Sequence, residues 1–218
     1  MSRPTTPHVV AIAGPSGSGK TSLAREIVTR VPGGGFVFGL DSYYGDQRDV
    51  PEDAINVDAP DALDHPRIVM DLRALAAGRH IRQPVYDYAT HARLSTDRVV
   101  EPAPFIVVEG LYALFWAEVR ELIHTAVFVS LDHEECLRRR LDRDTRERGR
   151  TARAVTRQYE RDVRPMYDVH VHPTHRYAKV ILDGRLPLEE LTRQVLLLFL
   201  PERLRPPSTD DDIGDQQG

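Results

Sequence analysis

Cysteine is almost absent from this sequence of 218 residues, because Cys136 is the single one. No internal disulfide can form, which favours a reducing, cytoplasmic environment. No stretch approaches the roughly 18 consecutive apolar residues of a membrane span, and residues 1–7 lack the apolar segment of a signal peptide. The sequence therefore predicts a cytoplasmic protein without a membrane partner.

A basic excess is also lacking, since the net charge is −4. The imbalance comes from residues 206–218, which contain aspartates and no basic residue, while acidic and basic side chains balance in the rest of the chain. A protein that binds duplex nucleic acid would normally carry a basic excess, so we expect no nucleic-acid partner. We predict one domain over residues 1–205 and a disordered acidic tail over residues 206–218.

Lysine is nearly as rare as cysteine, and one of the few lysines completes a motif. Residues 14–21, GPSGSGKT, fit the pattern G-x-x-x-x-G-K-[ST] of loops that bind nucleotide phosphates. An apolar run at 9–13 and apolar residues at helical spacing over 22–28 supply the strand and the helix that this motif needs, whereas a flexible Gly/Ser turn would not require them. Lys20 would reach the outer phosphates of ATP and Thr21 would hold Mg²⁺. Nucleotide contacts are predicted for Gly14, Ser16, Gly17, Ser18, Gly19, Lys20, Thr21 and Ser22.

Two acidic residues follow apolar runs that are typical of buried strands. Asp41 comes after residues 36–40, and Glu109 comes after residues 105–108. In open α/β sheets the functional groups lie beyond the carboxyl ends of the strands, so both carboxylates are expected to face the phosphates. Glu109 would lie on the metal side of the site. The structural alternative for Asp41 is a cap of the next turn.

Strand and helix patterns alternate along most of the chain. We predict helices at 66–77, 114–123 and 188–200 and after Asp132, strands at 126–131 and 178–182, and a loop at 45–65. Extended segments at 81–88 and 94–100 form a hairpin-like excursion around residues 89–93. The alternation predicts an α/β fold of the P-loop NTPase type, with a parallel sheet, helices on both faces, the small β-hairpin excursion and a helical lid at 132–165.

Arginine is concentrated between positions 138 and 150. One interpretation is a solvated helix face, on which Asp142, Asp144 and Glu147 neutralise the arginines through pairs one turn apart. The other is a mobile basic helix that closes over the nucleotide and brings guanidinium groups to the transferred phosphoryl group. Composition alone leaves both interpretations open.

Together these motifs resemble those of the uridine kinase (uridine-cytidine kinase) family of P-loop kinases. The resemblance runs from residue 8 to residue 183. It rests on residues 14–21, 40–44, 56–64, 84–88 with His91 and Arg93, 108–110, and 139–144 with 147–150. It is less close at Val57 and Ala59, where the family usually has an aromatic residue and a histidine, and at Lys179, where it usually has aspartate.

This resemblance implies a pyrimidine-salvage enzyme that uses ATP and Mg²⁺ to phosphorylate the 5′-hydroxyl of uridine, and also of cytidine. It implies that Asp41 is the catalytic base, that Lys20 and Arg143 are also catalytic, and that Glu109 acts with Thr21 around Mg²⁺. Arg140 and Arg143 would belong to the lid over the phosphates. The implied nucleoside contacts are Tyr44, Asp58, Tyr86, His91, Arg150 and Gln158. The resemblance also implies a homo-oligomer.

Other interpretations remain open at this point. A related kinase that resembles pantothenate kinase or phosphoribulokinase would share the phosphate loop and the catalytic acid but not the acceptor pocket. An ATP-binding regulator would bind ATP without forming a phosphorylated small product. Three histidines are close enough in sequence to ligate zinc, namely His170, His172 and His175. The alternative is that they are ordinary polar or surface histidines. Cys136 is expected to be a buried apolar residue, and Phe115 and Trp116 are expected to be core residues rather than ligand contacts.

Overall fold

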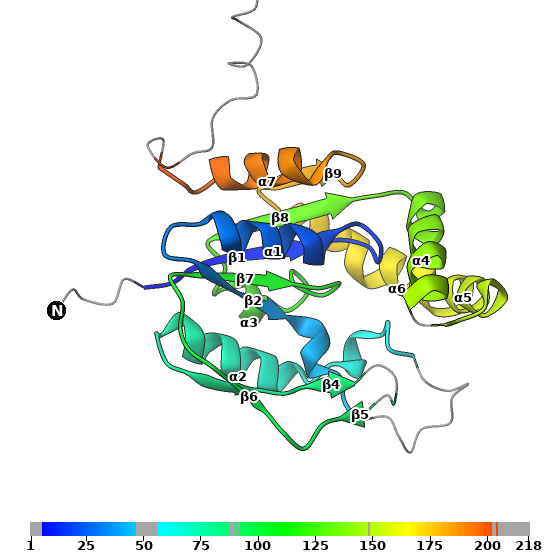
Figure 1. The fold of residues 1–218 in the computed structure, drawn as a ribbon, viewed down its shortest axis with the longest axis horizontal. Helices are drawn as coiled ribbons and strands as arrows, with labels where there is room; N and C mark the ends of the chain where they lie inside the picture. Colours follow the sequence, from blue (N-terminus) through cyan, green and yellow to red (C-terminus); the bar gives the residue numbers. More distant parts are fainter. Residues whose placement is uncertain are drawn as a thin grey trace, which may run out of the picture.

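A five-stranded sheet lies at the centre of the molecule, and its neighbouring strands all run parallel (Figure 1). This computed structural model describes residues 6–46, 56–87, 90, 92–147, 149–201 and 204. The strand order is β2-β7-β1-β8-β9. The strands are β1 (His8–Ala13), β2 (Gly35–Gly39), β7 (Phe105–Glu109), β8 (Thr125–Ser130) and β9 (Val180–Asp183). The predicted parallel sheet is confirmed, with boundaries that move by one or two residues.

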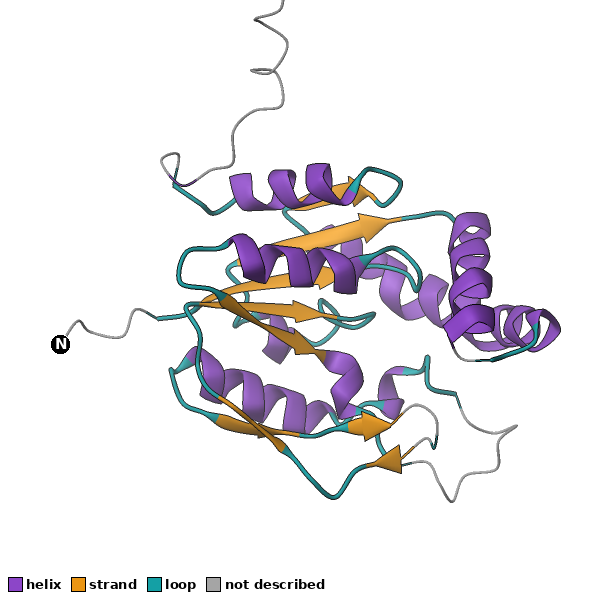
Figure 2. Cartoon of the chain, in the orientation of Figure 1, coloured by secondary structure: helices purple, strands orange, loops and turns teal. Residues whose placement is uncertain are grey.

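Helices cover both faces of this sheet, as predicted (Figure 2). Because side chains alternate along a strand, β1 sends Val10 and Ile12 to one face and Val9, Ala11 and Ala13 to the other. The first face is covered by α1 (Lys20–Arg30) and α7 (Leu188–Leu197), and the second by α2 (His65–Ala76) and α3 (Ala117–Arg120). The central strand β1 is therefore apolar on both faces from Val9 to Ala13, which is the pattern of a parallel sheet buried on both sides.

A helical arm begins beyond the carboxyl ends of the strands, toward which the strand arrows point, and its last part returns behind the sheet (Figure 1). It begins with α4 (His133–Glu147), where Asp132 accepts a hydrogen bond of 2.8 Å from the backbone N–H of Glu135. The helix predicted after Asp132 is thus confirmed, together with the N-cap that begins it. The arm continues through α5 (Ala152–Gln158), a π-helical turn (Tyr159–Val163), α6 (Arg164–Met166), a second π-helical turn (Tyr167–Val171) and a 3₁₀ helix (His172–Tyr177).

The predicted excursion at 81–100 is also present, but it consists of two antiparallel ladders rather than one. Strand β3 (Ile81–Gln83) pairs with β6 (Arg98–Val100), and β4 (Tyr86–Asp87) pairs with β5 (Ala92–Arg93). The expectation that residues 89–93 only connect two strands was wrong, because Ala92 is buried and pairs with Asp87.

The helix predicted at 114–123 was too long, since residues 111–116 form turns and α3 spans only Ala117–Arg120. The physical reason is local. The Arg120 guanidinium donates hydrogen bonds to the carbonyls of Leu114 and Phe115, so these groups are satisfied without an earlier helix. Phe115 and Trp116 are partly buried against the core, as expected.

Other predictions can be compared only in part. Of the loop predicted at 45–65, the described portion contains a short 3₁₀ turn (Pro60–Ala62) and a bridge between Tyr44 and Leu63. The predicted tail at 206–218 lies outside the described residues. None of the helices in the described ranges has the length and apolar character that crossing a membrane would require.

Candidate active site

The glycine-rich loop at 14–21 connects β1 to α1 at the carboxyl edge of the sheet. Gly14 has a φ of +148°, and a Cβ there would lie 2.3 Å from the carbonyl oxygen of Val129. Gly19 caps α1 with a φ of +90° in the left-handed region. Any other residue would be strained at these two positions, so the backbone, rather than side chains, sets the shape of the loop.

The loop leaves hydrogen-bond donors without partners at the start of α1. The first turn of this helix has no acidic residue and no side-chain cap. The Ser18 hydroxyl is buried and has no hydrogen-bond partner. A helix N-terminus in this state attracts anions, because its unsatisfied N–H groups and its dipole both favour negative charge. The predicted phosphate-binding loop thus has the geometry that phosphate binding needs.

Lys20 lies buried at the floor of this loop, with 8% of its surface exposed, and its amino group donates a hydrogen bond of 2.7 Å to the carbonyl of Pro15. Burial lowers the pKa of Lys20, while the nearby carboxylates of Glu109 and Asp41 act in the opposite direction. The amino group is therefore held close to two acids and to the loop that would surround the phosphates.

Glu109 ends β7 and accepts hydrogen bonds from the Thr21 hydroxyl at both carboxylate oxygens, each at 3.2 Å. Burial, followed by repulsion from Asp41, raises the pKa of Glu109 to about 7. A hydroxyl oxygen beside a carboxylate in a crowded acidic setting is a donor set that suits Mg²⁺, which prefers oxygen ligands. The residues predicted to hold Mg²⁺ are therefore adjacent, as their strand and helix positions implied.

Asp41 lies on a 3₁₀ turn, Leu40–Tyr43, that follows β2 directly. It is exposed, and this turn has no side-chain cap, so a capping role finds no support. Its negative charge also contributes to raising the pKa of Asp58, which is raised chiefly by burial. One exposed carboxylate thus acts electrostatically on Lys20, Glu109 and Asp58, three residues that are distant in sequence.

Asp58 forms the opposite side of this cluster and is nearly fully buried. One of its carboxylate oxygens lies 3.7 Å from the Arg140 guanidinium, and the other has no hydrogen-bond partner. Its backbone carbonyl accepts a hydrogen bond from the Tyr112 hydroxyl. A buried carboxylate oxygen without a donor is costly, and a hydroxyl group of a ligand would satisfy it.

Two further predicted acceptor contacts, Tyr44 and Tyr86, come from short elements near Asp41. The rings of Tyr44 and Tyr86 lie 5.2 Å apart and both side chains are buried. Tyr44 follows the Asp41 turn, whereas Tyr86 belongs to β4, so the excursion packs against the turn that follows β2. The predicted contact His91 lies outside the described residues.

The arginines of α4 gather around a fully buried carboxylate, Asp144. Arg143 donates to it at 2.9 Å, and Arg140 and Arg150 approach it to 3.5 Å and 3.7 Å. Gln158 accepts hydrogen bonds from both Arg140 and Arg150, at 3.2 Å and 2.7 Å. Arg140 also donates to the Ser16 hydroxyl of the phosphate loop at 3.1 Å. The three arginines predicted for the site are therefore joined in one network.

The two faces of the arginine-rich helix make different contacts. Arg138 is largely exposed and pairs with Glu135, which is the behaviour of a solvated face. Arg140, on the opposite face, is 5% exposed and contacts the phosphate loop. Since residues three and four apart share one face of a helix, a single helix carries a solvated face and a face that contacts the loop at 14–21, and closure over a nucleotide stays a prediction.

Three residues of the site had no role assigned from sequence. Asp144 was noted only as a neutralising charge, although its spacing of four from Arg140 was a usable signal. Arg139 donates to the carbonyls of Gly17 and Gly184, at 3.5 Å and 3.0 Å, and so ties α4 to the phosphate loop. Tyr112 carried no signal, because its contact with Asp58 depends on a turn that was predicted as the approach to a helix.

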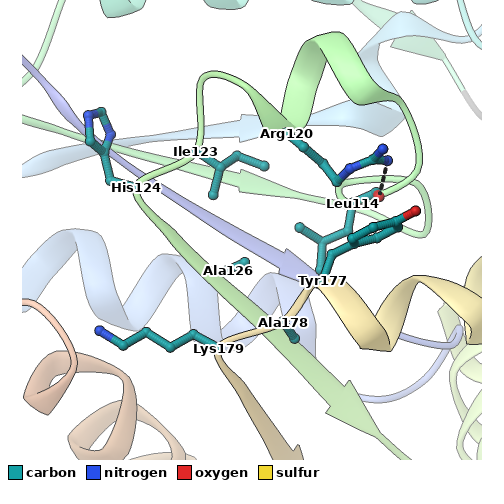
Figure 3. A pocket seen from close by; sticks show the side chains of 8 residues that line it. All are labelled: Leu114, Arg120, Ile123, His124, Ala126, Tyr177, Ala178 and Lys179. Atoms are coloured by element: carbon teal, nitrogen blue, oxygen red, sulfur yellow. Dashed lines mark hydrogen bonds between the residues drawn. The ribbon is translucent and has the colours of Figure 1, made fainter.

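Two hollows among the described residues lie apart from this cluster. One, of about 280 Å³, is lined by Leu114, Arg120, Ile123, His124, Ala126, Tyr177, Ala178 and Lys179. Figure 3 shows its lining side chains, with the amino group of Lys179 pointing away from Arg120, whose guanidinium stacks on Tyr177. The other, of about 620 Å³, borders the edge strand β9 and includes Ile181 and Asp183.

The residues considered for other chemistry take ordinary positions. Cys136 is buried, and burial raises the pKa of its thiol to about 11, so it does not behave as a nucleophile. The rings of His172 and His175 lie 4.8 Å apart, and His170 lies edge-on to Phe115. Within the described ranges, no three potential ligands gather around a point where a metal ion could bind.

A family model and the curated relatives that match this sequence agree on one family. The family described as "Phosphoribulokinase / Uridine kinase family" matches residues 9–191. A uridine kinase of Deinococcus deserti is 44% identical over 180 residues, which cover 81% of this chain and 87% of the relative. A uridine kinase of Leuconostoc citreum is 40% identical over 198 residues, which cover 86% of this chain and 94% of the relative.

Solved structures show the same fold at low identity. A chain titled a possible uridine kinase from Bacillus stearothermophilus superimposes with a TM-score of 0.61 at 17% identity, over 84% of this chain and 91% of that one. A phosphoribulokinase from Rhodobacter spheroides gives a TM-score of 0.63 at 15% identity, over 84% of this chain and 74% of that one. The central parallel sheet with helices on both faces is therefore an architecture shared with P-loop kinases.

Proposed function

Because the chain belongs to the phosphoribulokinase and uridine kinase family, we propose that it transfers the γ-phosphate of ATP to the 5′-hydroxyl of uridine and of cytidine. The observation that carries this proposal is the position of Asp41, whose charge acts on Lys20 and Glu109 on one side and on Asp58 on the other. A carboxylate between a phosphate-binding loop and a second buried carboxylate suits a base that serves an alcohol acceptor.

On the donor side, the backbone of residues 14–21 and the amino group of Lys20 bind the outer phosphates of ATP. Thr21 and Glu109 would hold Mg²⁺, which would neutralise phosphate charge. Arg140 and Arg143 belong to a lid at 132–165 and approach the transferred phosphoryl group. Phosphoryl transfer needs little more than this positioning and charge neutralisation.

On the acceptor side, Asp58 accepts hydrogen bonds from the ribose hydroxyls through the carboxylate oxygen that has no partner in the protein. Tyr44, Tyr86 and His91 contact the pyrimidine, and Arg150 with Gln158 encloses the nucleoside. Asp41 takes the proton of the 5′-hydroxyl as that oxygen attacks the γ-phosphorus. The bond from this phosphorus to the β-phosphate oxygen breaks, and ADP leaves with the electron pair.

A parallel assay of acceptors tests this proposal. With ATP and Mg²⁺, we expect uridine and cytidine to be turned over at the highest kcat/KM among uridine, cytidine, adenosine, pantothenate and ribulose 5-phosphate. A non-nucleoside as the best acceptor would overturn the nucleoside assignment and leave the donor half intact. ATP binding without a phosphorylated product would instead identify a regulator. The cytoplasmic location and the homo-oligomer are further proposals, which cell fractionation and light scattering test.

A further inference from the structure

Arg93 of β5 connects three segments that the proposed function assigns to the acceptor. It pairs directly with Tyr86 across the β4–β5 ladder. Its guanidinium donates to the Asp64 carboxylate at 3.0 Å and to the backbone carbonyl of Tyr43 at 3.2 Å. Tyr43 ends the turn that begins with Leu40 and Asp41, and Asp64 follows the segment that contains Asp58.

The groups that Arg93 contacts are themselves fixed. The carbonyl of Tyr43 also accepts the backbone N–H of Asp64 at 2.9 Å, and Asp64 caps α2 by accepting the N–H of Arg67 at 3.2 Å. The Tyr43 side chain is fully buried, stacks on Phe38 at 5.1 Å, and donates its hydroxyl to Asp71 of α2. The turn that carries Asp41 is therefore fastened to α2 at its far end.

Arg93 brings the β4–β5 hairpin into this arrangement, while Arg67 of α2 donates a hydrogen bond to the carbonyl of Arg82 in β3. The turn that contains Asp41 and the strand that contains Tyr86 both lie outside the central sheet. Pairing within that sheet therefore does not fix the distance between them. A planar guanidinium that forks between a carboxylate and a carbonyl fixes both distance and orientation, which a single flexible charge does not.

We infer that Arg93 is a positioning residue, which holds the acceptor-binding hairpin at a set distance from the carboxylate of Asp41. The inference rests on the proposed function in one respect, which is that the ligand bound by this hairpin is the acceptor. It states that the effect of Arg93 falls on transfer to the acceptor and not on the binding of ATP. A displacement of about 1 Å between reacting groups is enough to lower the rate about a hundredfold.

The test compares Arg93→Gln with Arg98→Gln. Arg98 lies exposed on β6, the next strand along the chain, and its guanidinium contacts Gln83 and the ring of Phe36, which makes it a matched control. We expect Arg93→Gln to lower kcat by about 10- to 100-fold and to raise the acceptor KM, with the ATP dissociation constant unchanged within about twofold. Arg98→Gln should retain the wild-type kcat.

Further variants separate positioning from folding. Arg93→Lys should recover only a small part of kcat, because an ammonium reaches one acceptor and not two. Asp64→Asn keeps an oxygen to cap α2 and weakens the bond to Arg93, so it should lower kcat less than Arg93→Gln. The double variant Arg93→Gln/Asp64→Asn should be no worse than Arg93→Gln alone, since both remove one shared contact.

Several outcomes would overturn the inference. They are a wild-type kcat in Arg93→Gln, an equal loss in Arg98→Gln at equal melting temperature, or a loss of ATP affinity that matches the loss of kcat. Failure of the proposed function looks different, because the wild-type protein would then prefer another acceptor in the parallel assay. The comparison of Arg93→Gln with Arg98→Gln is in that case made with the preferred acceptor, and the same outcomes decide it.

Discussion

The two halves of the proposed site, which we call the donor half and the acceptor half after their proposed roles, are built in different ways. The donor half takes its shape from the central sheet, because residues 14–21 follow β1 and Glu109 ends β7, and these two strands are paired along five positions. The acceptor half comes from a 3₁₀ turn and from strands of two residues. It is held by side chains, namely Arg93 on Asp64, Tyr43 on Asp71 and Tyr112 on the carbonyl of Asp58.

This difference predicts how each half responds to substitution. A change in the donor half alters a step that every acceptor shares, so it should lower activity without changing the preference among acceptors. A change in the acceptor half alters side chains that would contact the acceptor itself, so it should change the preference among acceptors. Solved structures at 15–17% identity share the central sheet with its helices.

The largest expected loss of activity is at Asp41, whose charge acts on residues of both halves. Asp41→Asn removes the proposed base and keeps its volume, so kcat should fall by about 10²- to 10⁴-fold. ATP affinity, measured by calorimetry, should stay near the wild-type value because the phosphate loop is untouched. Asp61→Asn, at an exposed acid in the nearby turn Pro60–Ala62, is the control and should keep full activity. Full activity in Asp41→Asn would remove this residue from the mechanism.

Within the donor half, Lys20 offers the next largest effect. Lys20→Met removes a buried positive charge beside the phosphates, and the loss of one such group lowers kcat by about 10²- to 10³-fold. The ratio of kcat/KM for uridine and cytidine should not change. Lys179→Met is a natural control, since it replaces the other lysine of the chain, which is exposed. A changed uridine/cytidine ratio in Lys20→Met would contradict the separation of the two halves.

Asp144 tests the network that joins the halves. Asp144→Asn removes the charge shared by Arg140, Arg143 and Arg150 while keeping a similar shape. Loss of a buried pair costs about 3 kcal/mol of the free energy of unfolding, and kcat/KM for ATP should fall about tenfold, which corresponds to about 1.4 kcal/mol. Denaturant titration and steady-state kinetics measure the two effects. Asp142→Asn, at an exposed acid of the same helix that pairs with Arg146, should change neither.

The same division explains what the sequence could predict. The phosphate loop, Asp41 and Glu109 were predicted because a short motif and the ends of apolar strands locate them without any knowledge of distant contacts. Asp144 and Arg93 were not given roles, because their partners depend on how helices and short strands pack. The helix at 114–123 was wrong for a related reason, since the Arg120 side chain satisfies carbonyls that a helix would otherwise have to satisfy.

Asp58 provides the smallest and most specific test. Asp58→Asn keeps a polar group for the ribose hydroxyls but loses their charge-assisted hydrogen bonds, so the acceptor KM should rise about fivefold, which is about 1 kcal/mol. The KM for ATP should not change. A KM for the acceptor that stays at the wild-type value would remove Asp58 from the acceptor site.

The pH dependence of stability gives an independent measure of Asp58. Burial raises its pKa above 3.8, Asp162 and Asp41 act in the same direction, and Arg140 and Arg143 oppose it. Because the folded state then binds the proton more tightly than the unfolded state, the free energy of unfolding falls as pH rises from 3.8 through the raised pKa. Asp58→Asn should lack this fall and should unfold at a higher denaturant concentration than the wild type at neutral pH. A carboxylate that costs stability and yet improves acceptor binding is what a binding residue, rather than a structural one, would show.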